Sequence, residues 1–299
     1  MKVAFFTEME FNGTIPRTHK NMRTEFAWMV ALNATHYNLK SIPTEEYDLG
    51  IVVNSKNNPE WVDVEGLKLK CKKVAVMQEG PFWYFQDYPL AKQIHYFNNL
   101  TSADIIYAHN EVDVQYFKGL TNHKDVRVLR SLMIEDPINE LTNPKSRSGV
   151  MIGGNMKSWY GGFDSFMLAS SVTDEIYQPK MGRREEGEDE LGLTQLPYME
   201  WDKWISELSK RKIGIHMMRT HAAGTFALNC SYLGIPCIGY DGLDTQRILH
   251  PSLTVKDGDL NTARKLISRL DNDSDFYTLC SNKTLEMYNE HYHESTFKI

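Results

Sequence analysis

The sequence predicts an α/β protein of two domains, each built on a parallel β-sheet with flanking helices, whose sheets face a cleft. Short apolar runs alternate with segments of helical periodicity along the chain, which is typical of parallel sheets. The chain has 299 residues, about the length of two domains. The alternation is interrupted at 131–148, where turn-forming residues replace the periodic pattern and indicate a linker.

The first half contains segments whose composition predicts strands and helices in alternation. Compact apolar runs predict strands at 2–6, 37–42, 49–53, 74–77, 104–108 and 126–129. Helical spacing of apolar residues predicts helices at 19–34 and 61–69, a helix that ends near residue 100, and one that includes 112–117. Polar residues follow several of these strands, and binding sites in parallel sheets lie at such strand ends.

The second half repeats this alternation after the linker. Strands are predicted at 150–155, 175–177, 213–217 and 237–238, and helices at 163–171, 201–209, 226–233, 260–270 and 276–291. The charged run at 183–190 is predicted to be a solvated loop. We therefore expect one domain at 1–140, a second at 141–280, and a final helix at 281–299 that packs back on the first domain.

Composition narrows the class of protein. With 41% hydrophobic and 24% charged residues, the chain resembles an ordinary globular protein. The net charge of −6 is spread so that neither half is a basic nucleic-acid-binding domain, although 17–23 is a local basic segment. The cysteines lack C-x-x-C spacing, which favours buried thiols in a reducing compartment. Without an apolar run of roughly 20 residues or a signal peptide, we expect a cytoplasmic protein.

The segment 213–239 predicts a strand, a turn, a helix and a second strand, which form one βαβ unit. The N-terminus of its helix offers free N–H groups and the positive end of the helix dipole, so a phosphate can bind there. The turn contains Arg219, His221, Gly224 and Thr225. Another glycine-containing turn, with Gly153, Gly154 and Lys157, follows the predicted strand at 150–155.

The order of Gly224, Asn229 and Gly234-Ile235-Pro236 resembles the nucleotide-sugar site of GT-B glycosyltransferases, in particular the large retaining family that includes glycogen-synthase-like enzymes. In that family two glutamates lie on either side of the turn. His221 and Asn229 occupy those positions here, so the resemblance is to a divergent member. It implies two Rossmann-like domains, the first binding the acceptor and the second binding the nucleotide sugar.

The resemblance implies roles for residues that would bind a nucleotide-sugar donor, expected to be a UDP-sugar. The diphosphate is expected to contact Gly153, Gly154, Lys157, Arg219 and the amides of Gly224 and Thr225. Asn229 occupies the ribose-binding position, and Tyr198 and Met199 bracket the nucleobase. We expect no metal ion, because the sequence has no clustered histidines and cysteines of the kind that bind zinc, and no cofactor besides the nucleotide sugar as co-substrate.

Residues at predicted strand ends of the first half are candidates for a general base that acts on an acceptor hydroxyl. These residues are Glu8, Glu10, Glu79 and His109, of which Glu79, then Glu10, then His109 are preferred, and His221 in the second half completes the catalytic set. Asn12, Gly13 and Arg17 are candidate acceptor-binding residues. The predicted acceptor is a glycan hydroxyl or a hydroxymethylated base in phage DNA.

Structural roles remain open for several of these residues. Asn229 fits a hydrogen-bonded core amide, Gly153 and Gly154 fit a strand terminus, and His216 is expected to be a packed histidine rather than a ligand. The aromatic residues at 82–88 fit either a core or a stacking platform. Two alternative functions also stay open: a sugar-nucleotide epimerase on the same scaffold, and a non-catalytic two-lobed protein that closes on a small ligand.

Overall fold

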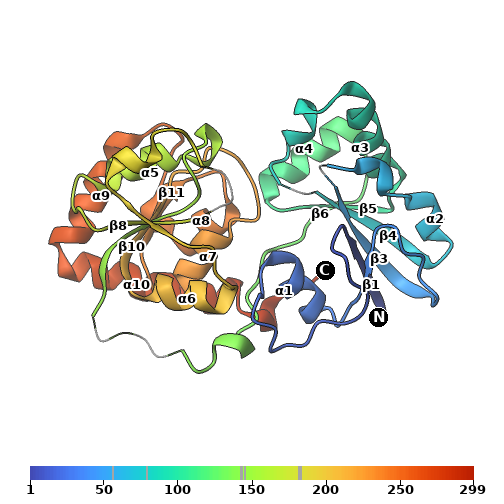
Figure 1. The fold of residues 1–299 in the computed structure, drawn as a ribbon, viewed down its shortest axis with the longest axis horizontal. Coiled ribbons are helices and arrows are strands. Elements are labelled where there is room, and N and C mark those ends of the chain that lie inside the picture. The colour runs from blue at the N-terminus through green and yellow to red at the C-terminus, as the bar shows by residue number, and fades with distance from the viewer. Residues whose placement is uncertain (56, 79, 142–143, 145, 181–183) are drawn as a thin grey trace.

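Two parallel β-sheets, each flanked by helices on both faces, lie side by side in the computed structural model of the chain (Figure 1). The structure describes residues 1–299 except 56, 79, 142–143, 145 and 181–183. The alternation of apolar runs and helical segments therefore produces the predicted α/β architecture. Within the described residues, no helix is both long enough and apolar enough to cross a membrane.

The first sheet has six strands in the order β2-β1-β3-β4-β5-β6, and neighbouring strands are parallel. Its strands are β1 (Val3–Thr7), β2 (Thr35–Asn38), β3 (Tyr47–Asn54), β4 (Cys71–Gln78), β5 (Ile105–Ala108) and β6 (Val126–Val128). The chain leaves β1 toward one edge and returns at β3 to build the other. The carboxyl ends of β1 and β3 therefore form the position at which such sheets bind ligands.

The second sheet also has six parallel strands, in the order β12-β11-β10-β7-β8-β9. Its strands are β7 (Ser148–Ile152), β8 (Ile176–Pro179), β9 (Thr194–Leu196), β10 (Arg211–His216), β11 (Cys237–Tyr240) and β12 (Thr254–Val255). The direction of winding reverses between β7 and β10. The turns that follow these two strands are consequently the expected ligand-binding position of this sheet.

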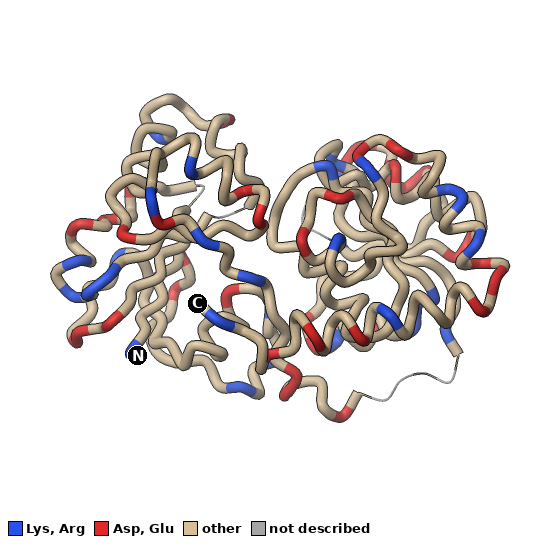
Figure 2. Tube along the Cα trace, turned by 180° about the vertical axis from the view of Figure 1, so that it is seen from behind, with Lys and Arg blue, Asp and Glu red and all other residues tan. Residues whose placement is uncertain are grey.

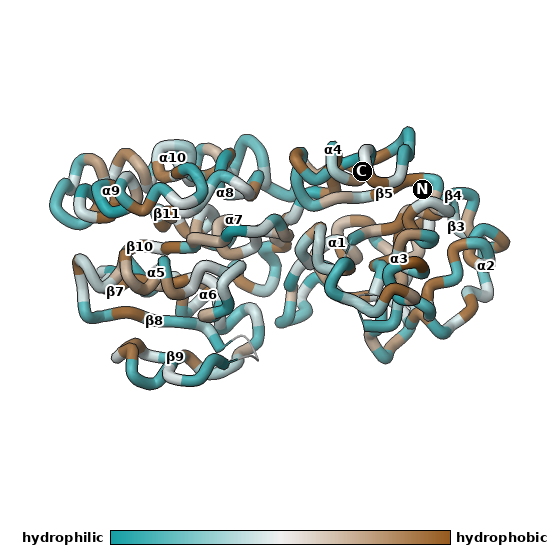
Figure 3. Tube along the Cα trace, turned by 90° about the horizontal axis from the view of Figure 1, so that it is seen from above, coloured by the Kyte–Doolittle hydropathy of each residue, from teal (hydrophilic) through white to brown (hydrophobic). Residues whose placement is uncertain are grey.

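Helices cover both faces of each sheet. The first sheet is flanked by α1 (Thr24–Ala31), α2 (Val64–Lys68), α3 (Leu90–Ser102) and α4 (Glu111–Thr121), and the second by α5 (Gly162–Ala169), α6 (Trp201–Ser209), α7 (Thr225–Tyr232), α8 (Asp244–Leu249), α9 (Leu260–Asn272) and α10 (Ser274–His291). Figure 3 shows apolar segments along strands such as β8 and polar segments on outer helices such as α9. Burial of these apolar runs between two helical layers is the main stabilising term.

One hydrophobic cluster runs through both halves of the molecule. It joins Phe5 of β1 and Trp28 of α1, through Leu132 and Ile134, to residues of α6 and α7 such as Phe226. Two further clusters each belong to a single sheet. The two halves therefore share apolar packing as well as polar contacts.

The C-terminus lies beside α1 in Figure 1, and residues near it contact the segment that connects the two sheets. The Tyr288 hydroxyl donates a hydrogen bond of 2.8 Å to the Glu135 carboxylate. The guanidinium of Arg130 lies 5.9 Å from the centre of the Tyr292 ring. These contacts attach α10 to residues that directly follow the first sheet.

Several elements differ from their predicted bounds for local reasons. The helix expected at 19–34 begins at Thr24, because Arg23 is extended and its side chain bonds to the distant Met199 carbonyl. The strand expected at 37–42 ends at Asn38. The side-chain amide of Asn38 donates hydrogen bonds to the backbone carbonyls of Glu8 and Met9. The helix expected at 61–69 is reduced to α2. Asp63 caps the N-terminus of this helix, because its side chain accepts a hydrogen bond of 2.9 Å from the Gly66 backbone amide.

The charged run at 183–190, predicted to be a solvated loop, contains one buried carboxylate in its described part. Glu188 is buried, and its carboxylate accepts hydrogen bonds from the Glu185 amide at 2.9 Å and the Gln195 side chain at 2.8 Å. Arg183, in the same run, lies outside the described residues. The 3₁₀ turn Glu188–Leu191 therefore packs on β9, a short strand that the apolar pattern does not predict.

Candidate functional site

The carboxyl edges of the two sheets meet at the turn that joins β10 to α7. Residues after strands of the first sheet bond to this turn: Trp83 Nε1 donates to Thr220 Oγ1 (2.7 Å), Asn110 Nδ2 donates to the Ala222 carbonyl (3.0 Å), and Ser131 Oγ donates to the Ala223 carbonyl (2.6 Å). Each bond pairs a polar group that would otherwise be left between the domains. The turn therefore forms part of a closed interface between the two halves.

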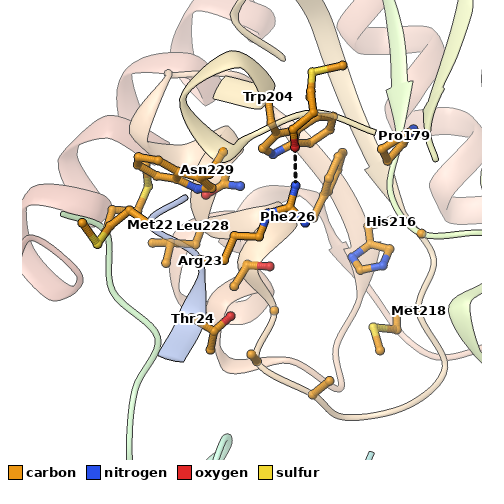
Figure 4. A pocket seen from close by; sticks show the side chains of 18 of the residues that line it. Met22, Arg23, Thr24, Pro179, Trp204, His216, Met218, Phe226, Leu228 and Asn229 are labelled. Carbon is orange, nitrogen blue, oxygen red and sulfur yellow. Dashed lines mark hydrogen bonds between the residues drawn. The ribbon is translucent and has the colours of Figure 1, made fainter. Parts of the chain in front are cut away.

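A cavity of about 250 Å³ lies beside this turn, between the two halves of the molecule. Its walls come from the start of α1, the connection at 132–133, the loop before α6, and the end of β10 with the start of α7. Figure 4 shows side chains from these segments pointing into it. The cavity thus lies at the reversal between β7 and β10, where the topology of the second sheet predicts a ligand.

The N-terminus of α7 opens into this cavity. Gly224 has a positive φ of 66° and precedes the helix, and Gly224, Thr225 and Phe226 all line the cavity. The first N–H groups of a helix have no partner within the helix, and they carry the positive end of its dipole. This part of the cavity wall is suited to an anionic group.

The charged side chains in the described part of the cavity wall are Arg23 and Lys180, and no carboxylate lies among the described lining residues. Arg23 Nη2 donates a hydrogen bond of 2.9 Å to the Met199 carbonyl, and the guanidinium lies 5.1 Å from the centre of the Tyr198 ring. Arg23 comes from the first half of the chain and the other two residues from the second. The wall therefore combines positive charge with aromatic and methionine side chains from both halves.

Asn229 faces the same cavity from the second turn of α7. With its amide oxygen turned toward Trp204, it accepts a hydrogen bond of 3.0 Å from Trp204 Nε1 and donates one of 3.2 Å to the Thr225 carbonyl. The amide is thus engaged within the protein, as the structural alternative for this residue predicts. Its position at the cavity wall is also that predicted for ribose recognition.

His216 ends β10 and lines the cavity opposite Arg23 (Figure 4). The residue is buried, with 7% of its surface exposed, and the centre of its ring lies 5.4 Å from that of Phe226. Neither ring nitrogen has a hydrogen-bond partner within the described residues. Burial lowers the pKa of His216 to about 4, so the imidazole is neutral near pH 7.

Most of the predicted donor-binding residues meet at this cavity. Those that line it are Gly154, Tyr198, Met199, Gly224, Thr225 and Asn229. Gly153 lies behind His216, and a Cβ atom added to this glycine would be 2.8 Å from the imidazole. The absence of a side chain at 153 therefore allows the histidine ring to occupy its place.

The two cations predicted to bind the diphosphate are paired with carboxylates of their own half. Arg219 donates a hydrogen bond of 2.7 Å to Asp164 and is about half exposed, and this pairing raises its pKa. Lys157 pairs with Glu185. Neither cation is among the residues lining the cavity. The positive charge at the described cavity wall comes instead from Arg23, within the basic segment 17–23, and from Lys180.

His221 lies on the outer side of the β10–α7 turn. Its Nδ1 is 2.7 Å from the buried carboxylate of Asp113, and its ring stacks on Phe82 with 5.0 Å between centres. Asn110 donates a second hydrogen bond, of 2.9 Å, to Asp113. His221 thus joins the two halves, and it is not one of the residues lining the cavity.

Two of the predicted catalytic residues of the first half, Glu10 and His109, lie in the described part of the chain. Glu79 lies outside the described residues, and Glu10 is exposed. His109 is buried at the end of β5, with its ring 5.9 Å from that of Trp28. Its Nδ1 lacks a partner in the described part of the chain, and burial lowers its pKa to about 4.

The predicted acceptor-binding residues make contacts within the first loops and at the chain end. Asn12 Oδ1 accepts a hydrogen bond of 2.9 Å from the Asn38 amide, and Gly13 forms a backbone bridge with His36. Arg17 pairs with Asp136 at 2.8 Å and Glu294 at 2.6 Å, which raises its pKa. Arg17 therefore fastens the C-terminal segment to the connection between the sheets.

Glu8 lies at the reversal of the first sheet, directly after β1. Its carboxylate accepts hydrogen bonds of 2.5 Å from Ser55 Oγ and 2.7 Å from Asn58 Nδ2. Both partners follow β3, the neighbouring strand. Among the described acidic residues of the first loops, Glu8 is thus the one held in place at the topologically expected position.

Solved structures of GT-B glycosyltransferases match this chain over most of its length. Anabaena HepE, crystallised with UDP-glucose, matches with a TM-score of 0.69 at 11% identity, over 99% of this chain and 97% of HepE. Sucrose-phosphate synthase from Thermosynechococcus elongatus matches with a TM-score of 0.63 at 11% identity, over 91% of this chain and 73% of the synthase. The protein therefore has the GT-B fold, as the resemblance implied.

A variant of S. aureus TarM, crystallised with UDP, matches with a TM-score of 0.62 at 8% identity over 83% of this chain. The chain spans about half of TarM, 53% of its length. No protein-family model matches the sequence, and no curated protein matches it. The similarity therefore lies in the three-dimensional arrangement rather than in a shared sequence pattern.

Proposed function

We propose that the protein is a glycosyltransferase that transfers a sugar from a nucleoside-diphosphate sugar, a UDP-sugar, to an acceptor hydroxyl. One observation carries the proposal: the cavity at the reversal of the second sheet combines a helix N-terminus, two cationic side chains and aromatic walls. These features match the phosphate and nucleobase of a nucleotide. The GT-B fold and the presence of UDP-glucose in the HepE crystals support the same ligand class.

The proposed binding mode follows from the chemistry of the cavity wall. The N–H groups at the start of α7 bind the diphosphate, helped by positive charge from Arg23 and Lys180. The base packs against Tyr198 and the methionine and tryptophan side chains near α6. The Met199 carbonyl, which now accepts a bond from Arg23, is the nearby backbone acceptor.

During transfer the bond between the anomeric carbon and the diphosphate oxygen breaks, and a bond to the acceptor oxygen forms. Negative charge accumulates on the leaving diphosphate, so fixed N–H groups and cations at that position lower the barrier. We propose that Arg219 contributes to this stabilisation by exchanging its partner Asp164 for the diphosphate. Arg219 is about half exposed in this pair, and Asp164, which is 19% exposed, also accepts a hydrogen bond of 3.3 Å from the Tyr240 hydroxyl.

We propose that the acceptor is a glycan hydroxyl that enters from the first sheet, next to Glu8. A carboxylate held by Ser55 and Asn58 at a strand reversal is placed to accept the proton of such a hydroxyl. DNA is a poorer acceptor candidate because a DNA-binding groove needs clustered cations. Figure 2 shows lysine and arginine interspersed with acidic residues over both halves.

The test is a thermal-shift panel of UDP, GDP and ADP and their glucose esters, followed by assay of nucleotide release with and without oligosaccharide acceptors. Stabilisation by one nucleotide family and acceptor-dependent release would support the proposal. Stabilisation with conversion of the sugar to its epimer would indicate an epimerase instead. If no nucleotide stabilises the protein, the proposed function is wrong.

A further inference from the structure

The imidazole of His216 differs from two other buried histidines, His36 and His250, which use both ring nitrogens in hydrogen bonds, and from His109, of which only Nδ1 lacks a partner in the described structure. His36 bonds through its two nitrogens to Thr7 Oγ1 and the Phe11 carbonyl, both at 2.9 Å. His250 Nε2 lies 2.9 Å from the Ala227 carbonyl, and its Nδ1 lies 3.0 Å from Thr284 Oγ1. In the described part of the chain, both nitrogens of His216 lack such partners.

An unpaired polar group in a protein interior is costly, because it loses its hydrogen bonds to water and gains nothing in return. An apolar side chain of similar size at 216 would avoid this cost. The ring is held in place by Phe226 on one side and by the space above Gly153 on the other. A ligand in the cavity that hydrogen-bonds to the ring of His216 would therefore explain why a histidine occupies this position.

The charge state of the ring restricts what that ligand group can be. Since burial lowers the pKa of His216 to about 4, the ring is neutral and offers one N–H donor and one acceptor nitrogen. No carboxylate is present in the described cavity wall to stabilise the protonated form. A hydroxyl, which donates and accepts, matches a neutral imidazole, whereas a phosphate would favour the charged ring.

We propose that His216 is a specificity-determining residue that hydrogen-bonds a hydroxyl of the bound nucleotide sugar, next to the phosphates held at the start of α7. This inference rests on the proposed function. The hydroxyl belongs to the ribose or to the transferred sugar, which are both polyols attached to the diphosphate. In either case the uncharged histidine binds a neutral hydroxyl, while the cationic residues of the same cavity bind the phosphates.

The test compares His216→Leu and His216→Gln with the parent protein, using UDP and UDP-glucose as probes in titration calorimetry, with GDP and ADP and their glucose esters in parallel. His216→Leu should weaken binding by about ten- to a hundredfold, the effect of losing one buried hydrogen bond. His216→Gln, which retains a donor and an acceptor, should recover part of the affinity. Weakening of both the diphosphate and its glucose ester identifies a ribose hydroxyl, and weakening of the ester alone identifies a sugar hydroxyl.

His123→Leu is the matched control for stability. His123 Nε2 lies 2.9 Å from the Ala103 carbonyl in the first half, so its replacement should lower the unfolding temperature of the ligand-free protein. His216→Leu should leave that temperature unchanged or raise it, because no bond is lost. An equal loss of stability in both variants would show that His216 is a paired structural residue and would overturn the inference.

The two hypotheses fail in different ways. If the parent protein binds a nucleotide and His216→Leu binds it equally well, the role of His216 is wrong while the proposed function stands. If the parent protein binds no nucleotide of the panel, the proposed function is wrong and the inference from it also fails.

Discussion

The guanidinium of Arg23 donates a hydrogen bond of 2.9 Å to the backbone carbonyl of Met199, which lies 176 positions further along the chain. The bond joins the start of α1, in the first half, to the loop that precedes α6, in the second half. Both residues line the cavity, so the bond closes the cavity on the side of the Tyr198 ring. A change in the relative position of the two halves would therefore break this bond and change the shape of the cavity.

Replacement of Arg23 by alanine should weaken nucleotide binding by about tenfold, because one charge-assisted contact and the closure of the cavity are both lost. The free energy of unfolding should change by less than about 1 kcal/mol, since the residue is only partly buried. Titration calorimetry with UDP and UDP-glucose and urea unfolding measure the two effects. Arg127→Ala is the control, because Arg127 pairs locally with Asp125 at 2.6 Å. Equal affinity of the two variants would contradict a role for Arg23.

Replacement of Arg219 by alanine should lower kcat/KM by about ten- to a hundredfold through the loss of one contact to the leaving diphosphate. Asp164→Asn is the matched variant, because it removes the partner of Arg219 at 2.7 Å and leaves the cation free. Donor use should be retained in Asp164→Asn. Should both variants keep full kcat/KM, Arg219 acts only as the structural partner of Asp164.

Gly224→Ala should destabilise the protein and abolish the site at the start of α7. Gly224 has a φ of 66°, and a Cβ atom would lie 2.1 Å from Thr245 Oγ1. Gly258→Ala is the matched control, because Gly258 has a φ of 81° but no atom within 4 Å of an added Cβ. The control should lose only about 1–2 kcal/mol from backbone strain, and Gly224→Ala should lose more. Urea unfolding of the pair separates backbone strain from the steric clash.

Acidification should destabilise the protein between about pH 6.5 and pH 4. Burial lowers the pKa of His109, His216 and His250 from 6.5 to about 4, so the folded state binds fewer protons than the unfolded state in this interval. Their full contribution to stability is therefore present above pH 6.5 and is lost as the pH falls toward 4. Urea unfolding from pH 8 to pH 4.5 measures the slope, which should be smaller in His216→Leu. A free energy of unfolding independent of pH over this range would contradict the prediction.

The two-sheet fold can be predicted from the sequence because fully buried parallel strands are continuous apolar runs. Strands such as β4 and β10 follow directly from that pattern. Elements with short or polar sequences cannot be predicted in this way. Helix α8 has six residues, and its buried Asp244, Thr245 and Gln246 are polar, so no apolar periodicity marks it.

The residues of the candidate site that are close together in the sequence are predicted. Those that tertiary contacts bring to the site from elsewhere in the chain are missed. Gly224, Thr225 and Asn229 line the cavity because they follow β10 within one βαβ unit. Arg23 is missed because it enters the cavity from a different sheet. The pairing of Arg219 with Asp164 cannot be predicted from the sequence, because the two residues are distant in the chain and come together only in the folded structure.

The apolar cluster that links Phe5 to Phe226 has a consequence for the way the molecule denatures. Separating the halves would expose apolar surface on each of them, so unfolding of one half destabilises the other. Calorimetry should therefore record a single endotherm rather than two. A fragment that contains only one half should be prone to aggregation when it is expressed alone.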